Sequence, residues 1–282
     1  SVLLPLVIIL LLYDVDARER RNGRFELLTA TGVASSTLLI RSAARILLLF
    51  VVVAVPFIVM AIAAEVSPPL VAAALLVVGA HMLIWLFLCR FVTSRCAEAP
   101  TAAVVLLGCW LLFTIVAPTT ARVVVEATAP VPDGGELLLT QREAVNDAWD
   151  LPTAATMEPF VELHPELRSH AEVSESFEWK WYYAFQQMGD EAVKAESESL
   201  RAGIERRHEL MGIAALLSPP LATERWLTHL AQTDRAHHQR YVHCVRAFHA
   251  SLREFHYPLL FGQQDFTTEA MAGLPKFRHC PD

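Results

Sequence analysis

The sequence lacks several motifs that would assign a chemistry directly. No phosphate-binding GxxxxGK[ST] run occurs in its 282 residues, so the chain cannot hydrolyse ATP by the P-loop route. It also has no HExxH pair, no Cys/His spacing of the zinc-finger type and no nucleophile elbow. A metalloprotease, a zinc finger and an α/β-hydrolase are therefore disfavoured, and a membrane-bound metallohydrolase would need a ligand set that we do not find.

Lysine is absent from residues 1–122, which carry nine Arg against six acidic residues. Residues 123–282 instead carry 14 basic against 24 acidic residues. The whole chain is 54% hydrophobic with a mean hydropathy of +0.38, which is too apolar for an ordinary soluble protein. The two parts suit two solvents, lipid and water, and we expect an all-α, polytopic membrane protein with an aqueous helical domain at 123–282.

Three stretches with few charges are each long enough to cross a bilayer: 38–64, 70–92 and 102–121. Residues 1–13 are as apolar but fall short of the ~20 residues that a span needs. We interpret them as part of a first spanning helix. A signal peptide is the rival interpretation, but the basic flank follows the apolar run and no small-residue cleavage site is present.

Arginine marks the orientation of these spans. Residues 14–45 hold six Arg, the link after the second span holds only Glu65, and the next link holds Arg90 and Arg95. The positive-inside rule places the first and third links in the cytoplasm. Residues 123–282 are then expected outside the cytoplasm.

This external part has helical patterning and no strand alternation. Helices are predicted over 136–149, 176–217 and 222–255, the last two forming an antiparallel hairpin around Pro219 and Pro220. The hairpin tip is apolar, and two interpretations stay open for it. It either dips towards the membrane surface or forms an ordinary buried turn.

The segment 14–37 mixes charges of both signs with an apolar edge. As a short helix it would be amphipathic, with Phe25, Leu27 and Leu28 beside the charges. Topology alone explains the positive sign, whereas the mixture suits docking onto a protein partner. The candidate docking residues are Arg18, Glu19, Arg20, Arg21, Gly23, Arg24, Phe25 and Glu26.

The order of these features resembles the permease subunits of ABC-2-type transporters. The similarity lies at Glu19, Arg20, Gly23, Glu26, Leu27 and Leu28, followed by Arg41 and Arg45 at the start of the next span. The chain departs from the family at "TATG", where a Pro is common. The runs "APTTARVVVEATAP", "HPEL" and "LSPPLATERWLTHLAQTDRAHH" are similar to the DUF3526-like branch, which carries a large extracytoplasmic helical domain.

The resemblance implies that 14–37 is the coupling segment, seated on a separate cytoplasmic ABC ATPase subunit. The chain is then a non-catalytic subunit without a cofactor of its own, and ATP and Mg²⁺ bind the partner. A second permease copy or a related chain, the lipid bilayer and another envelope protein are the further expected partners, and nucleic acid is not one. The implied location is the bacterial cytoplasmic (inner) membrane, with export or extraction of a substrate, and the family pattern places further segments before Ser1 and a final span after Asp282.

A membrane-anchored sensor or scaffold is the alternative function. In that hypothesis the external helices bind a metal or a protein, and the arginines engage a signalling partner. Candidate ligands are Asp234 with His238, and His249 with His256, but solvated helix positions are the simpler interpretation and no metal site is assigned.

Other polar residues stand out by their position. His81 lies in the middle of a predicted span, where it either marks a functional cavity or makes an interhelical hydrogen bond. Cys244 and Cys280 both fall in the external part, where an oxidising compartment would permit a disulfide between them.

Overall fold

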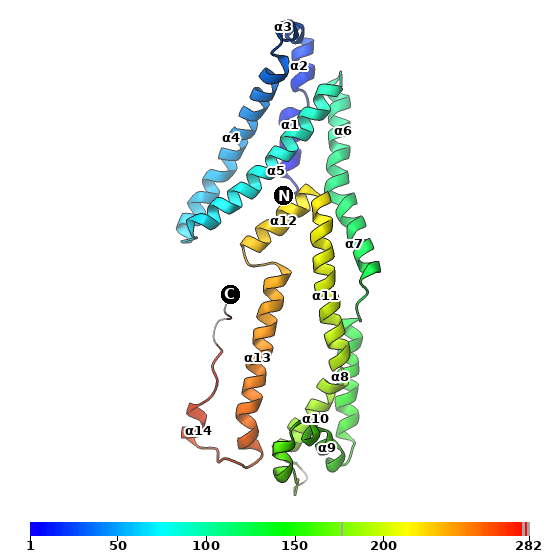
Figure 1. Cartoon of the computed structure of the whole chain (residues 1–282), viewed down its shortest axis with the longest axis vertical. Helices are drawn as coiled ribbons and strands as arrows, with labels where there is room; N and C mark the ends of the chain where they lie inside the picture. Colours follow the sequence, from blue (N-terminus) through cyan, green and yellow to red (C-terminus); the bar gives the residue numbers. More distant parts are fainter. Residues whose placement is uncertain (176, 278–279, 281–282) are drawn as a thin grey trace. The chain divides into compact units, whose positions relative to one another are not determined.

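The chain is helical throughout the part that the structure describes. The structure is a computed structural model that describes residues 1–175, 177–277 and 280, and every regular element in these residues is a helix (Figure 1). The all-α expectation is thereby confirmed for the described residues. The chain forms two compact units: unit 1 is Ser1–Thr128 with His208–Asp234, and unit 2 is Ala129–Arg207 with Arg235–Asp282.

Unit 1 contains three helices that are long and apolar enough to cross a membrane, as predicted. Each begins two to four residues before the apolar stretch, and Pro stands in the first turn of two of them, where its missing N–H costs nothing. The helices are α4 (Ala34–Ala63), α5 (Pro68–Arg95) and the continuous run Ala99–Thr128, which comprises α6 (Ala99–Leu111), the π-helical turn η1 (Leu112–Val116) and α7 (Ala117–Thr128).

The short apolar helix α1 (Leu4–Leu12) packs inside this bundle. It contacts α4, α5 and α6, and its Ile8 and Leu12 are 0% and 1% exposed. Trp85 of α5 and Leu106 of α6 are equally enclosed. The burial of α1 among the spans supports its interpretation as a membrane segment.

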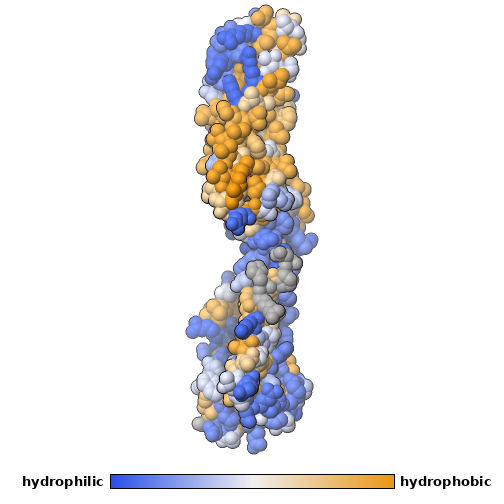
Figure 2. Space-filling model, turned by 90° about the vertical axis from the view of Figure 1, so that its left-hand side faces the viewer, coloured by the Kyte–Doolittle hydropathy of each residue, from blue (hydrophilic) through white to orange (hydrophobic). Residues whose placement is uncertain are grey.

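The outer surface of the bundle is apolar. Ile40, Leu48, Met60 and Leu76 are each about two-thirds or more exposed, as expected of helices that face lipid and unusual for a face in water. Figure 2 shows the apolar surface gathered over these helices and a hydrophilic patch at the end where α2 (Val15–Arg21) and α3 (Arg24–Ala30) lie.

Unit 2 is built around an aromatic core. Phe160 stacks on Phe261 with ring centroids 5.3 Å apart, and Trp181 donates from Nε1 to Thr156 Oγ1 at 2.8 Å. The helices of this unit are α8 (Gly134–Trp149), α9 (Thr153–Leu163), η2 (Pro165–His170), α10 (Trp179–Ala192), α11 (Lys194–Ala214) as far as Arg207, α13 (Arg235–Leu260) and α14 (Thr268–Ala272).

One close approach fixes α8 against α10. A Cβ added to Gly189 would lie 2.4 Å from Val145 Cγ2 and 3.0 Å from the Gln141 carbonyl oxygen. Only glycine leaves room for the neighbouring backbone at this point. The two helices therefore touch along their length.

The long predicted helices are interrupted. The run 176–217 is divided at Val193 into α10 and α11, and the run 222–255 is divided into α12 (Pro219–Leu230) and α13. Helix α12 ends because Gln232 adopts a left-handed φ of 55° and the Thr233 N–H returns to the Thr228 carbonyl at 2.9 Å. The break at Pro219 lies where the 3₁₀ turn η3 (Ala215–Leu217) gives way to α12.

Glu178 secures the loop that enters α10. Its Oε1 accepts hydrogen bonds from the backbone N–H of Ser174 at 2.6 Å and of Glu175 at 3.1 Å, and its Oε2 lies 2.9 Å from Lys180 Nζ. The hydrogen bond from Lys180, and after it those from the backbone, lower the pKa of Glu178 from 4.5 to about 2. The charged form is therefore favoured by folding.

We expect replacement of Glu178 by Gln to destabilise unit 2 by about 1–2 kcal/mol at pH 7, because a carboxylate with several donors is lost. A lowered pKa stabilises the fold above the unfolded value, so the difference from wild type should shrink as the pH falls from 4.5 towards about 2. Chemical unfolding followed by tryptophan fluorescence at pH 7 and pH ~3 measures both values. An equal difference at both pH values would contradict this role of the charge.

Candidate functional site

The charged segment folds as two short helices joined at a left-handed glycine. Helix α2 ends at Arg21, and Gly23 adopts a φ of 67° before α3 begins at Arg24. A Cβ at Gly23 would meet nothing within 4 Å, so glycine is required by the backbone conformation and not by space. The sequence feature "NG" thus sets the sharp turn between the two helices.

Three acidic residues at the beginning of the segment point inwards, whereas Glu26 is exposed. Asp14, Asp16 and Glu19 are 7%, 2% and 8% exposed. Each carboxylate pairs with an arginine, because an unpaired buried carboxylate would be costly. The pairs are Asp14 with Arg18, Asp16 with Arg90 of α5, and Glu19 with Arg41 of α4, the last at 2.8 Å.

Two of these pairs tie α2 to the spanning helices. The Asp16 and Arg90 side chains are only 3% and 11% exposed, so water hardly weakens this pair. Arg45 of α4 adds a hydrogen bond from Nη1 to the Leu11 carbonyl at 2.7 Å. Removing one member of the buried pair would leave the other charged and without compensation.

The opposite side of the segment is exposed and mainly cationic. No residue of α3 is buried, and Leu27 is 68% exposed. The Arg20 guanidinium lies 4.5 Å from the ring centroid of Phe25, which holds the two side chains together. We call this surface the α2–α3 face; it comprises Arg20, Arg21, Arg24, Glu26 and Leu27.

Not all predicted docking residues lie on this face. Glu19 is turned inwards to Arg41, Phe25 is half-buried, and Arg18 is exposed but engaged with Asp14. Sequence reasoning missed Asp16 and its partner Arg90, which lie 74 residues apart. The available signal was an arginine near the end of a long apolar helix, since such a residue either stays in water or finds an acid.

His81 makes the second polar contact of unit 1. Its side chain is 1% exposed, and its Nδ1 lies 2.8 Å from Oγ1 of Thr223 in α12. The Thr223 Oγ1 also lies 2.8 Å from the Pro219 carbonyl, so its hydroxyl can donate to that carbonyl while it accepts from the Nδ1–H tautomer of His81. Of the two interpretations of His81, this contact is the interhelical hydrogen bond.

Ser218 makes a matching contact at the beginning of α12. Its Oγ donates to the Phe113 carbonyl of η1 at 2.6 Å and accepts from the Leu221 N–H at 3.3 Å. A π-helical turn leaves a carbonyl without its usual partner, and such turns recur at functional sites. One hydroxyl therefore satisfies η1 and caps α12 together.

Both contacts lie halfway along spanning helices. His81 is the fourteenth of the 28 residues of α5, and Phe113 is the fifteenth of the 30 between Ala99 and Thr128. We call His81 with Thr223 and Phe113 with Ser218 the mid-span pairs. The beginning of α12 thus packs against the middle of α5 and of the run Ala99–Thr128, and both interpretations of the hairpin tip stay open.

More polar atoms gather near the mid-span pairs. His81 Nε2, Trp85 Nε1 and Thr114 Oγ1 are buried, and none has a hydrogen-bond partner among the described residues. The ring of Trp85 lies 6.5 Å from those of His81 and Phe113. This neighbourhood is a second cluster of buried polar atoms in unit 1, apart from the acid–arginine pairs of α2.

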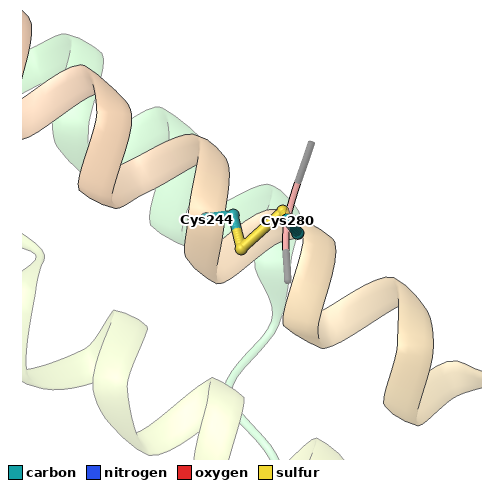
Figure 3. The surroundings of a disulfide bond; sticks show 2 residues. All are labelled: Cys244 and Cys280. Atoms are coloured by element: carbon teal, nitrogen blue, oxygen red, sulfur yellow. A yellow bond between two sulfur atoms is a disulfide. The ribbon is translucent and has the colours of Figure 1, made fainter. Parts of the chain in front are cut away.

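The cysteine pair lies in unit 2. Cys244 of α13 and Cys280 form a disulfide with a Cα–Cα distance of 6.0 Å, within the range that a bridge requires (Figure 3). Cys89, Cys96 and Cys109 are free. The bridge ties the chain after α14 to α13.

The candidate metal ligands are engaged in local contacts. Asp234 accepts from His229 at 2.9 Å, and His256 Nδ1 lies 2.7 Å from the Leu252 carbonyl of its own helix. His249 is exposed on α13 and lines a cleft of unit 2. The possible ligands that the structure brings together are His229, Asp234 and His237, whose ligand atoms lie within 4.8 Å of one another, so Asp234 is joined by His237 and not by the predicted His238.

A family model matches the second half of the chain. The family is described as "Domain of unknown function (DUF3526)", and the match covers residues 135–280, more than half of the sequence. The chain belongs to the DUF3526 family. The matched region begins in α8 and runs through α13 to Cys280, so the family covers unit 2 together with the mid-span residues Ser218 and Thr223. No curated protein and no solved structure matches the chain.

We expect Ser218→Ala and Thr223→Val each to destabilise unit 1 by about 1–2 kcal/mol, because each leaves a buried polar partner without its hydrogen bond. Thr228→Val is the matched control, since its hydroxyl bonds only to carbonyls of its own helix. Thermal unfolding in detergent compares the variants. A double-mutant cycle of Thr223→Val with His81→Leu should give a coupling of about 1 kcal/mol, and strict additivity would contradict the pairing.

Proposed function

We propose that the chain is the membrane-spanning permease subunit of an ABC-2-type transporter. In this function it couples ATP hydrolysis by a separate cytoplasmic ATPase to the export or extraction of a substrate. The chain itself is non-catalytic, and ATP and Mg²⁺ bind the partner. The observation that carries the proposal is the α2–α3 face: an exposed, mainly cationic surface on a segment whose three acids in 14–19 are all paired with arginines of this chain.

Charge complementarity supports a protein partner for this face. With Asp14, Asp16 and Glu19 satisfied within the chain, only Glu26 opposes Arg20, Arg21 and Arg24 on the surface. An acidic groove on an ATPase subunit would complement three arginines around one exposed leucine. Arginine also suits such a contact because its planar fork binds carboxylates with two hydrogen bonds.

The same pairs provide a route for movement. A displacement of α2 acts directly on α5 through Asp16 and Arg90, and on α4 through Glu19 and Arg41. The middle of α5 in turn holds α12 through His81 and Thr223. We propose that ATP-driven displacement of the α2–α3 face is transmitted along α5 to the beginning of α12. The resulting movement of α12 would open or close a route for the substrate through the centre of the bundle.

The proposed location follows from charge and family resemblance. The arginine-rich end of the bundle faces the cytoplasm of a bacterium, unit 2 lies outside the cytoplasmic membrane, and a second permease copy or a related chain completes the transporter. The external helices are free to gate substrate or to meet another envelope protein.

The test is a pull-down of the full-length, detergent-solubilised protein from its native host. We expect a P-loop ATPase to copurify, and Arg20→Gln combined with Arg24→Gln to lower its yield at least about tenfold, because two charge-assisted contacts are lost. Arg122→Gln is the control, since Arg122 is also exposed and pairs with Glu126 of its own helix, away from the α2–α3 face. Unchanged ATPase yield and ATP turnover in the double variant would contradict the coupling role, and absence of any ATPase with wild type would favour the sensor or scaffold hypothesis.

A further inference from the structure

Unit 2 contains an open cleft whose walls differ in chemistry. It has a volume of about 530 Å³, within the usual range of small-molecule sites, and is formed by α8, α10, α11 and α13. Its basic wall includes Arg201 of α11 and Arg246 of α13. Its apolar wall is lined by Leu137, Leu138, Val193 and Leu200.

Helix α13 differs in charge from the rest of unit 2. Residues 129–207 carry seven basic against 16 acidic residues, whereas α13 carries four Arg, five His and a single acid, Glu254. A basic helix beside an acidic surface serves charge balance in the simplest interpretation. An arginine of α13 that lines the cleft indicates a ligand only if no carboxylate of the protein pairs with it.

Two of the positive charges that line the cleft are neutralised by acidic residues of the same unit. Arg253 faces Asp190 at 3.8 Å, and Lys194 pairs with Glu191 at 3.0 Å. Asp190 is further held by Gln141 Nε2, which donates to its Oδ1 at 2.8 Å. These two cations are compensated within the protein.

The positive charges of Arg201 and Arg246 are not neutralised in this way. Within the described part of the chain, neither forms a salt bridge with a carboxylate, although Glu198 also lines the cleft. Arg201 Nη2 donates to the Ser197 hydroxyl at 2.8 Å. Arg246 is exposed as a residue, but partial desolvation in the cleft, and next the like charge of Arg201, lower the pKa of its guanidinium. Two guanidinium groups that repel each other beside an acidic surface are the arrangement expected where an external anion bridges them.

The apolar wall narrows the class of anion. Leu138 is 58% exposed although it lies directly on the cleft, and an inorganic anion would leave this surface in water. We infer that the cleft binds an amphiphilic anion, with its acidic headgroup between Arg201 and Arg246 and its hydrocarbon part along Leu137, Leu138 and Leu200. The inference does not depend on the proposed transport function, because binding to unit 2 requires no ATPase.

The test uses the full chain in nanodiscs of zwitterionic phosphatidylcholine, with empty nanodiscs subtracted. Dansyl-labelled undecanoic acid is the probe, and its methyl ester is the neutral comparison. We expect saturable binding of the acid, at least about tenfold weaker binding of the ester, and at least about tenfold weaker binding of the acid to Arg201→Gln and Arg246→Gln, since each removes a charge-assisted contact. Arg240→Gln is the matched control, because Arg240 lies on the same helix but does not line the cleft.

A second variant tests the apolar wall. Leu138→Ser should weaken the long-chain probe several-fold and leave displacement by inorganic phosphate unchanged. Absence of saturable binding to wild type, equal binding of the ester, or unchanged affinity in both arginine variants would overturn the inference. Displacement by inorganic phosphate as effective as that by unlabelled decanoate would reduce the cleft to a simple anion site and overturn the amphiphile class. Retention of the Cys244–Cys280 disulfide and of the tryptophan emission shows that each variant is folded.

Discussion

A polar group inside a bundle of apolar helices has no water to bond with, and unit 1 is arranged around that requirement. Asp16 needs Arg90, the Phe113 carbonyl needs Ser218, and His81 needs Thr223. Each pair joins segments that are distant in the chain, by 74, 105 and 142 residues. These contacts decide which elements are neighbours.

Apolar packing in the same bundle has a different effect. Trp85, Met82 and Leu106 fill the interior closely, but lipid tails solvate such side chains almost as well as other helices do. Burial of apolar side chains in unit 1 therefore stabilises contact between the helices but favours no single arrangement of them. In unit 2 water surrounds the helices, and there the aromatic core around Phe160 and Trp181 drives folding while ion pairs at the surface contribute little.

The sequence predicts those features of the fold that depend on local composition. The three spans follow from hydropathy, and the α8 helix follows from its apolar spacing; the structure adds that the Asp133 side chain caps it. The break at Val193 was not predictable, because no Pro or Gly stands there and the forty-residue pattern reads as continuous. Local rules describe a helix, but tertiary contacts decide where it bends.

In the candidate site, too, local features were predictable from the sequence and contacts between remote residues were not. Amphipathicity identified the exposed arginines of the α2–α3 face, yet it placed Glu19 among them, because its partner Arg41 lies 22 residues away. In the cleft of unit 2, nothing in the sequence brings Arg201 and Arg246 together, since they belong to different helices. Distances between remote residues are the information that a single sequence does not contain.

The π-helical turn and Ser218 also constrain each other during evolution. An ordinary α-helix over Leu112–Val116 would direct the Ala117 N–H to the Phe113 carbonyl, whereas the π-helical turn directs it to the Leu112 carbonyl and leaves the Ser218 hydroxyl as the donor to Phe113. A relative without the turn would therefore need no donor at position 218, but it would still need a side chain there that caps α12. The length of this turn and the choice between a hydroxyl and another capping side chain at 218 are expected to covary.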